Sequence, residues 1–357
     1  MSLKFFAIGP QFDRIHRDFY RYILAALCIF CYPLVAFGDE NQASGRYALL
    51  VGVSHPPKIP SLRPLKGIEN DIKAMRSTAL KLGIPEHNLR VLADSSDEPR
   101  PTYQAILENM RWIEKNVPSG SSVLVYFAGH GGQQPANLKE NPSPESDELD
   151  EIFFATDSEP WNEKSYSAPN TLTDNKMRVW LEALQDKNIH VWLIVDMCHA
   201  GTFSRGTERQ DNESDYEILA RRGATLADIG IDVSSKRWMN HNFQIRPKAR
   251  VFSFNHPKGP TKKSDEYGRS KIVSFYASSE SGETAEVRHR HNPAKIHGLF
   301  TLFLTEEIQR MTKSALSNQL NSYRLLMYRI QARYRRELNN QFEPAFDGVD
   351  SGLWFGR

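Results

Sequence analysis

A histidine and a cysteine each follow an apolar run of the sequence that has the composition of a buried strand. His130 comes after residues 123–127, and Cys198 comes after residues 191–195. In an open parallel α/β sheet, the carboxyl ends of the strands share one edge, and chemistry is carried out there. A thiolate is a strong nucleophile, and an imidazole beside it can take up and return the proton. The two residues therefore predict a site for nucleophilic cysteine catalysis.

Glycines around the histidine support this interpretation. The backbone N–H groups of Gly131 and Cys198 could form an oxyanion hole, where a side chain would crowd the scissile carbonyl. Gly129 and Gly132 would allow the turns that such a loop needs. The alternative is a buried cysteine that acts only as a small hydrophobic residue.

The rest of the chain predicts strands that alternate with helices. Strands are predicted at 46–53, 89–93, 123–127, 152–155, 190–196 and 272–277. Helices are predicted at 68–82, 101–117, 174–184, 297–311 and 316–337. Short helical crossovers between such strands favour an α/β fold with a mostly parallel central sheet and helices on both faces. Residues 205–271 are polar and weakly periodic, which predicts a functional loop or a disordered insert.

Residues 1–38 resemble a secretory signal peptide, with basic residues, then an apolar stretch, then small residues before Asp39. The apolar stretch is shorter than the ~20 residues of a membrane span. We therefore expect an exported, periplasmic or secreted protein with a linker at 39–45, and an uncleaved membrane anchor is the alternative. Cleavage would remove Cys28 and Cys31 and leave Cys198 without a partner for an internal disulfide. A single thiol in an oxidising compartment is easier to explain by a functional role than by a role in packing.

The composition is typical of a globular protein and excludes few classes of function. The chain has 357 residues, of which 40% are hydrophobic and 25% charged, and its net charge is +2. So small a charge gives no argument for a nucleic-acid partner. We expect protein or peptide substrates and a monomer, with a membrane partner only if the N-terminal segment stays uncleaved.

Several motifs, in order, resemble the caspase-fold cysteine peptidases of clan CD, family C14, and most closely their metacaspase-like and bacterial caspase-domain members. The motifs are 47–53 YALLVGV, 65–71 LKGIEND, 126–131 YFAGHG, 147–151 DELDE, 196–201 DMCHAG, 277–279 ASS, 283–286 ETAE, 298–301 GLFT, 344–348 PAFDG and 353–356 LWFG. The resemblance implies a caspase-like (caspase-haemoglobinase) peptidase domain at 46–357. Within it, 46–204 would correspond to the large subunit, 205–271 to the linker and 272–357 to the small subunit.

The resemblance implies that His130 and Cys198 are the catalytic dyad. They lie further apart than the ~50 residues typical of caspases, and the loop at 131–147 could hold the excess. The residues around Cys198 lack the Gln-Ala-Cys form, which favours the metacaspase side and implies cleavage after arginine or lysine. A basic side chain needs buried carboxylates at the floor of its pocket, and Asp71 and Asp196 occupy the matching positions. The alternative for Asp71 is an acid favoured by the dipole at its own helix N-terminus.

The sequence carries less evidence for a metal or cofactor than for the catalytic dyad. The dyad requires no cofactor, but many metacaspases bind calcium, and Asp157, Asp174 and Asn175 match three of the positions involved. The fourth position is Arg205, and a cation there disfavours a site that needs several oxygen ligands. Asp174 is alternatively a helix cap. The histidines of the segment 289–297 are assigned to a polar loop rather than to a metal site.

The insert also carries basic residues at which a peptidase of this specificity could cut its own chain. They are Arg205, Arg209, Arg221, Arg222, Lys262 and Lys263. Self-cleavage there is a hypothesis, and the alternative is a charged loop in a chain that stays single. For the whole protein we expect a cysteine-type endopeptidase. The alternatives are a caspase-fold scaffold or pseudoenzyme that acts by binding, and a thiol-dependent acyl transferase of the same clan.

Overall fold

The computed structural model describes residues 45–94, 97–137, 149–198, 214–232, 234–235, 272–278, 284–311, 323–338 and 342–348. All of them belong to one compact unit, residues 44–357. The predicted signal or anchor segment lies outside the described residues, so export stays a prediction. No helix in the described part of the chain combines the length and apolar character that crossing a membrane requires.

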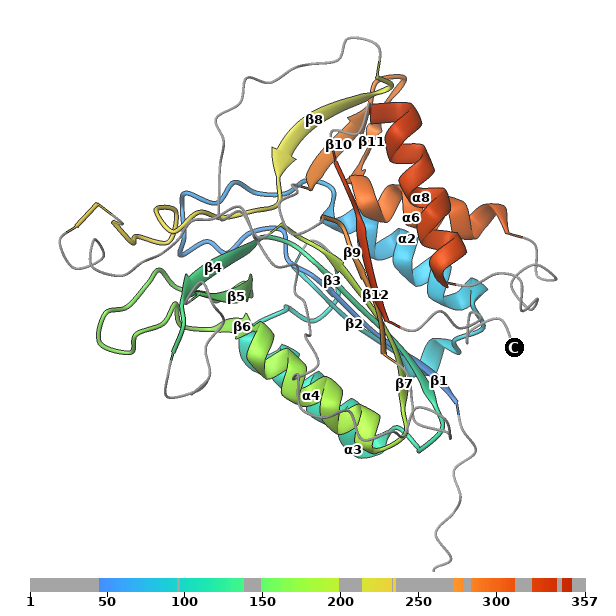
Figure 1. Cartoon of the computed structure of the whole chain (residues 1–357), viewed down its shortest axis with the longest axis horizontal. Helices are drawn as coiled ribbons and strands as arrows, with labels where there is room; N and C mark the ends of the chain where they lie inside the picture. Colours follow the sequence, from blue (N-terminus) through green and yellow to red (C-terminus); the bar gives the residue numbers. More distant parts are fainter. Residues whose placement is uncertain are drawn as a thin grey trace, which may run out of the picture. The chain divides into compact units, whose positions relative to one another are not determined.

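Within these ranges, the centre of the fold is a six-stranded sheet with the order β12-β9-β7-β3-β1-β2 (Figure 1). Its strands are β1 (Arg46–Gly52), β2 (Leu89–Ala93), β3 (Ser122–Ala128), β7 (His190–Asp196), β9 (Ile272–Tyr276) and β12 (Ala345–Gly348). All neighbours pair in parallel except β12, which is antiparallel to β9 at one edge. The predicted strand bounds at 89–93 and 190–196 are confirmed.

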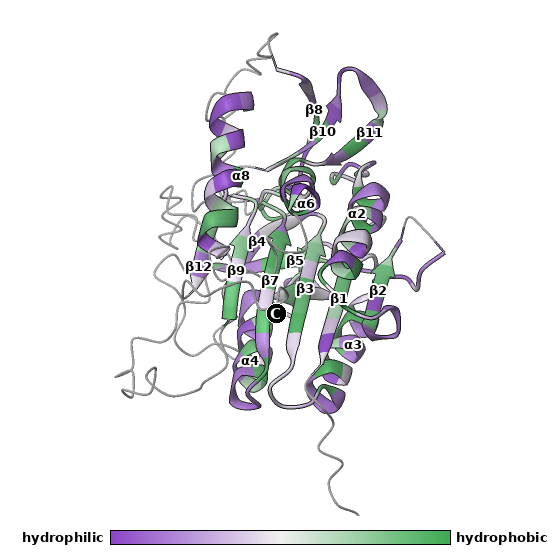
Figure 2. Cartoon of the chain, turned by 90° about the vertical axis from the view of Figure 1, so that its right-hand side faces the viewer, coloured by the Kyte–Doolittle hydropathy of each residue, from purple (hydrophilic) through white to green (hydrophobic). Residues whose placement is uncertain are grey.

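Helices cover both faces of this sheet (Figure 1). One face carries α2 (Ile68–Lys81), α6 (Leu299–Arg310) and α8 (Tyr323–Leu338), and the other carries α3 (Tyr103–Asn116) and α4 (Asp174–Asp186). A short 3-10 helix, η1 (Glu86–Asn88), precedes β2. The strands are apolar on both faces, because alternate residues enter different cores: Leu124 packs with α2 and α6, whereas Val123 packs with α3 and α4. Figure 2 shows the central strands mostly in the green of hydrophobic residues, beside helices in which hydrophilic and hydrophobic residues alternate. The predicted fold class is confirmed.

Two small antiparallel sheets adjoin the carboxyl ends of the central strands. One has the order β4-β5-β6, with β4 (Gly131–Pro135), β5 (Leu149–Phe154) and β6 (Thr171–Thr173). The other has the order β11-β10-β8, with β8 (Tyr216–Arg221), β10 (Ala285–His289) and β11 (Asn292–Gly298). These sheets contribute Gly131, Glu286 and His297 to the site described below.

The small sheets correct three sequence-based predictions. β4 lies in the predicted polar loop 131–147, β8 lies inside the predicted structureless insert, and β10 and β11 replace the loop assigned to the histidines at 289–297. Strand β4 has no apolar alternation, yet all five of its residues are buried by contacts from other elements. Strand β8 pairs with a strand far along the chain, in register from Arg221↔Ala285. Neither β4 nor β8 therefore shows the alternating hydrophobic pattern of a strand in its own sequence, so that pattern could not predict them.

Candidate active site

Two adjacent strands bring the histidine and the cysteine to the same edge of the sheet. Strands β3 and β7 are parallel neighbours in which Ala128 pairs with Asp196. His130 and Cys198 therefore each lie two residues beyond a paired position. Both are buried, with 2% and 1% of their surfaces exposed. The sheet register thus explains how residues far apart in sequence reach one site.

One ring nitrogen of His130 makes a hydrogen bond that orients the imidazole, and the other nitrogen is available to accept a proton. Its Nε2 lies 2.7 Å from the carbonyl oxygen of Arg63. Because a carbonyl can only accept a hydrogen bond, this contact assigns the proton of the neutral ring to Nε2. Nδ1 is buried and has no hydrogen-bond partner among the described residues. The ring is therefore oriented with a basic lone pair at Nδ1.

Burial keeps both members of this pair uncharged. It lowers the pKa of His130 to about 4, and the nearby guanidinium of Arg222 acts in the same direction. It raises the pKa of the Cys198 thiol to about 11, although a backbone hydrogen bond from Thr284 opposes the shift. At neutral pH the site therefore holds a thiol and a neutral imidazole.

The backbone N–H groups predicted to form an oxyanion hole converge on one carbonyl oxygen. Gly131 N–H donates to the carbonyl oxygen of Arg222 at 3.1 Å, and Cys198 N–H donates to the same atom at 3.0 Å. The site requires glycine at position 131, because a Cβ there would lie 2.7 Å from the Cys198 carbonyl oxygen. Two convergent donors of this kind can stabilise an oxygen on which negative charge develops.

The two predicted pocket acids also meet, and Arg222 lies between them. Asp71 is in the first turn of α2, and Asp196 is the last residue of β7. Arg222 Nη2 lies 2.5 Å from Asp71 Oδ2, and Nη1 lies 3.0 Å from Asp196 Oδ2. All three side chains are completely buried. We call the two carboxylates and the space between them the acidic pocket.

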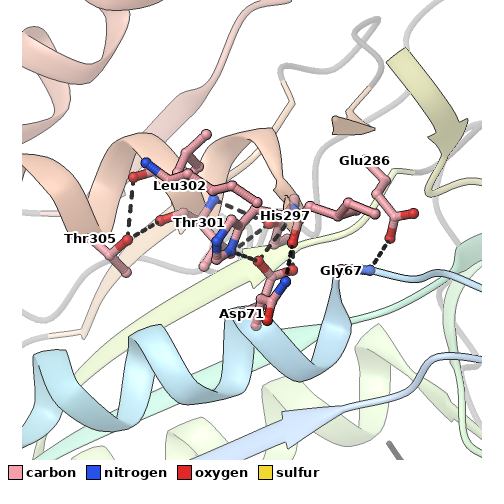
Figure 3. A network of polar contacts seen from close by, with 12 residues as sticks. Gly67, Asp71, Glu286, His297, Thr301, Leu302 and Thr305 are labelled. Atoms are coloured by element: carbon pink, nitrogen blue, oxygen red, sulfur yellow. Dashed lines mark hydrogen bonds and ion pairs between the residues drawn. The ribbon is translucent and has the colours of Figure 1, made fainter. Parts of the chain in front are cut away.

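Elements other than its own helix hold Asp71 in the acidic pocket. Gly298 N–H donates to both of its carboxylate oxygens, at 3.1 and 3.0 Å. His297 Nδ1 contacts Oδ1 at 3.0 Å, and Figure 3 shows the two side chains facing each other. The start of α2 is fixed separately by Glu286, which accepts hydrogen bonds from the N–H groups of Lys66 and Gly67 at 3.0 and 2.6 Å. Asp71 is thus aimed across the site, whereas Glu286 satisfies the helix N-terminus.

Asp196 lies at the N-terminal turn of α6. Thr301 donates to its Oδ2 twice, from N–H at 3.2 Å and from Oγ1 at 2.6 Å. Burial alone would lower the pKa of Arg222, but the carboxylates of Asp196 and Asp71 raise it above its ordinary value. The positive end of the helix dipole and one guanidinium therefore compensate two buried carboxylates.

The sequence analysis did not assign a role to Arg222 beyond its membership in a set of basic residues. It also missed the polar contacts of His297, Glu286 and Thr301. The motifs 283–286 and 298–301 were a signal for the last two, but a motif does not specify which atom a side chain contacts. The motif residues at 147–148, 199–201, 279, 283 and 353–356 lie outside the described residues.

The three residues matched to a calcium site do not form a donor set in the described part of the chain. Asp157 Oδ1 accepts a hydrogen bond from Tyr103 N–H at the start of α3, at 2.8 Å. Asn175 Nδ2 donates to Asp150 at 2.9 Å, and Asp174 is the first residue of α4. The described residues contain no cluster of three or more His, Cys, Asp or Glu side chains that could hold a metal ion. Arg205 lies outside the described residues, and calcium binding stays a prediction without a geometric basis.

Known proteins resemble this chain in sequence or in fold. Residues 46–205 match the family described as metacaspase, peptidase C14 domain. The chain is 30% identical to Metacaspase-1 of Sclerotinia sclerotiorum over 171 residues, which are 47% of this chain and 36% of the relative. It is 29% identical to Metacaspase-1B of Neurospora crassa, over 45% of this chain and 35% of the relative. The match thus spans little more than a third of the length of these relatives.

A crystal structure of a Geobacter sulfurreducens protein shares the fold at 17% identity, with a TM-score of 0.53 and coverage of 85% of this chain and 93% of that one. Residues 46–205 of this chain are therefore similar to the metacaspase, peptidase C14 domain, and the described structure has the fold of the Geobacter protein.

Proposed function

We propose that this protein is a cysteine endopeptidase that hydrolyses peptide bonds after arginine or lysine. In this proposal Cys198 is the nucleophile, and His130 is first the general base and then the general acid. Gly131 and Cys198 supply the oxyanion hole, and Asp71 and Asp196 bind the basic side chain of P1, the residue whose carbonyl is attacked. The similarity of residues 46–205 to metacaspases supports cysteine peptidase activity in general, and the geometry below supports the specificity.

One observation carries the proposal: a single arginine satisfies the oxyanion hole and the acidic pocket together. Its carbonyl oxygen accepts the two N–H groups, while its guanidinium contacts both carboxylates. The length of an arginine side chain limits how far its guanidinium can lie from its own carbonyl oxygen, and its rotamers set the distances within that limit. A site that accommodates both ends of one arginine therefore has dimensions compatible with a P1 arginine subsite. An aspartate at P1 would place a third negative charge there, which the pocket disfavours.

The geometry also supports a role for the backbone of β10. Arg222 N–H donates to the carbonyl oxygen of Thr284 at 3.2 Å, and the residues before Arg222 pair antiparallel with β10. A peptide substrate would add to the same strand edge, with main-chain hydrogen bonds that fix its register. Such pairing aligns the P1 carbonyl with the oxyanion hole before any bond is made or broken.

The chemical steps follow from these positions. The Cys198 thiol gives its proton to Nδ1 of His130, and the sulfur attacks the P1 carbonyl carbon. Negative charge develops on the carbonyl oxygen, and each N–H donor there is worth about 3 kcal/mol of transition-state stabilisation. His130 then protonates the leaving amine. Water hydrolyses the thioester and restores the thiol.

The test is a set of initial rates for the reduced full chain on fluorogenic peptides with arginine, lysine or aspartate at P1, with and without added calcium. We expect hydrolysis of the arginine and lysine peptides that disappears in Cys198→Ala and His130→Ala. Asp186→Asn, an exposed acid at the end of α4, is the matched control and should keep the wild-type rate. Cleavage after aspartate would contradict the roles of Asp71 and Asp196, and absence of all thiol-dependent cleavage would favour a scaffold that acts by binding.

A further inference from the structure

A histidine on β11 contacts the acidic pocket, and the proposed function leaves its role open. The residue is His297, whose Nδ1 lies 3.0 Å from Asp71 Oδ1. Because a carboxylate can only accept a hydrogen bond, this contact places a proton on Nδ1. The His297 side chain is 12% exposed, whereas the Asp71 side chain is completely buried. His297 therefore reaches from the molecular surface to one carboxylate of the pocket.

The backbone on either side of this contact is packed closely. A Cβ added at Gly67, directly before α2, would lie 2.9 Å from the Cα of His297. Asn70, in the first turn of α2, donates from Nδ2 to the carbonyl oxygen of Ile296 at 2.9 Å. Strand β11 and the start of α2 therefore have little freedom to move apart, and the ring of His297 is held against Asp71.

The two hydrogen-bond donors to Asp71 differ in what they fix. Gly298 N–H lies almost equally far from the two carboxylate oxygens, at 3.1 and 3.0 Å, so this donor does not select one of them. His297 contacts Oδ1, and Arg222 Nη2 contacts Oδ2. The rotation of a carboxylate about its Cβ–Cγ bond is otherwise only weakly restricted. The imidazole, which faces the carboxylate in Figure 3, therefore keeps Oδ2 directed toward the guanidinium.

This orientation matters more for arginine than for lysine. Arg222, which occupies the proposed place of a P1 side chain, contacts Asp71 Oδ2 through Nη2 and Asp196 Oδ2 through Nη1. A guanidinium is planar, so its two terminal nitrogens meet two separate carboxylates only when an oxygen of each points at them. An ammonium is a compact charge on a flexible stem and can adapt to a carboxylate that has rotated. A rotated Asp71 should therefore weaken the binding of arginine more than that of lysine.

We propose that His297 is a positioning residue that gives the site a preference for arginine over lysine at P1. Its Nδ1–H holds the Asp71 carboxylate so that Oδ2 faces one terminal nitrogen of the guanidinium. His297 acts through Asp71 and does not itself contact the substrate. This inference rests on the proposed function, because it concerns how the acidic pocket selects between the two basic side chains.

The test measures kcat/KM of the reduced full chain on matched peptides with arginine or lysine at P1. The ratio of the two values is the informative quantity, because occupancy of the pocket by Arg222 affects both peptides equally. We expect the wild type to prefer arginine, and His297→Leu to lower the ratio by about 10-fold through loss of a donor to a charged group. His297→Asn has nearly the shape of the leucine variant but carries an amide nitrogen at the position of Nδ1, so it should restore most of the ratio.

Three further variants separate this role from an effect on folding. His297→Phe keeps a ring without a donor and should also lower the ratio, even if His297→Leu folds poorly. His291→Leu changes an exposed histidine between β10 and β11, and as the matched control it should keep the wild-type ratio. In the Asp71→Asn background, His297→Leu should lower the ratio no further, because residues that act as one unit are not additive.

Four outcomes would overturn the role of His297 while leaving the peptidase function intact. They are an unchanged ratio in both donor-free variants, a ratio that His297→Asn does not restore, a further fall in the double variant, and a wild type that cleaves lysine peptides as fast as arginine peptides. Absence of Cys198-dependent cleavage of either peptide by the wild type would instead show that the proposed function itself has failed, and this inference with it.

Discussion

The charge of Asp71 should determine how well the enzyme distinguishes arginine from a neutral side chain of the same shape. Citrulline replaces the guanidinium of arginine by an uncharged urea group. The Asp71 carboxylate lies 2.5 Å from the guanidinium of Arg222 in a completely buried pocket. A hydrogen bond to a charged group contributes about 1.5–3 kcal/mol. We therefore expect Asp71→Asn to lower the ratio of kcat/KM for arginine over citrulline peptides by about 10- to 150-fold.

The ratio is the informative quantity, because it does not depend on how many active sites are open. Any segment that occupies the pocket competes equally with both peptides, so its effect cancels. The assay measures initial rates on matched arginine and citrulline peptides for the wild type, Asp71→Asn and the control Asp186→Asn. If Asp71→Asn lowered both rates equally and left the ratio unchanged, Asp71 would serve only the N-terminus of α2, and our account of the pocket would be wrong.

Three further changes test the surroundings of the site. A Cβ added in Gly298→Ala would overlap the groups in the acidic pocket, so kcat/KM for arginine peptides should fall by about 10- to 100-fold; an unchanged value would contradict this placement of the pocket. Burial holds the pKa of His130 near 4, so between pH 6.5 and 4 the unfolded chain binds a proton that the folded chain excludes, and stability falls as the pH falls. Urea denaturation of Cys198→Ala should therefore show about 2.5 kcal/mol less stability at pH 4.5 than at pH 7 from this group alone, a loss that the double variant with His130→Gln should lack. Glu286→Gln weakens the acceptor at the start of α2 and should lower the free energy of unfolding by about 1 kcal/mol, which thermal denaturation against the exposed control Glu114→Gln can measure.

The parts of the fold that depend on local hydrophobic pattern were predictable from sequence. The central strands are continuous apolar runs, and β3 and β7 end where the motifs place His130 and Cys198. Parallel neighbours bring their carboxyl ends together, so the proximity of these two residues follows from the pattern. Asp196 is tied to the same strand end and was predictable for the same reason.

The parts of the fold that depend on long-range pairing of polar segments were not predictable from sequence. Strand β8 forms because its backbone pairs with β10, and its sequence does not carry that information. The position of Arg222 follows from this pairing and from two carboxylates on α2 and β7. Arg221 and Arg222 are chemically identical in the sequence, and only the register of one strand decides which of them is buried.

The position of Arg222 has a consequence for any peptide that binds at the proposed site. Its carbonyl oxygen accepts the two N–H groups and its guanidinium contacts both carboxylates, so it would compete with a substrate as a ligand tethered to the enzyme. Short tethers give effective concentrations on the order of millimolar. A substrate peptide would have to exceed this competition, which raises its apparent KM. Because the competitor belongs to the same chain, dilution would not relieve the inhibition.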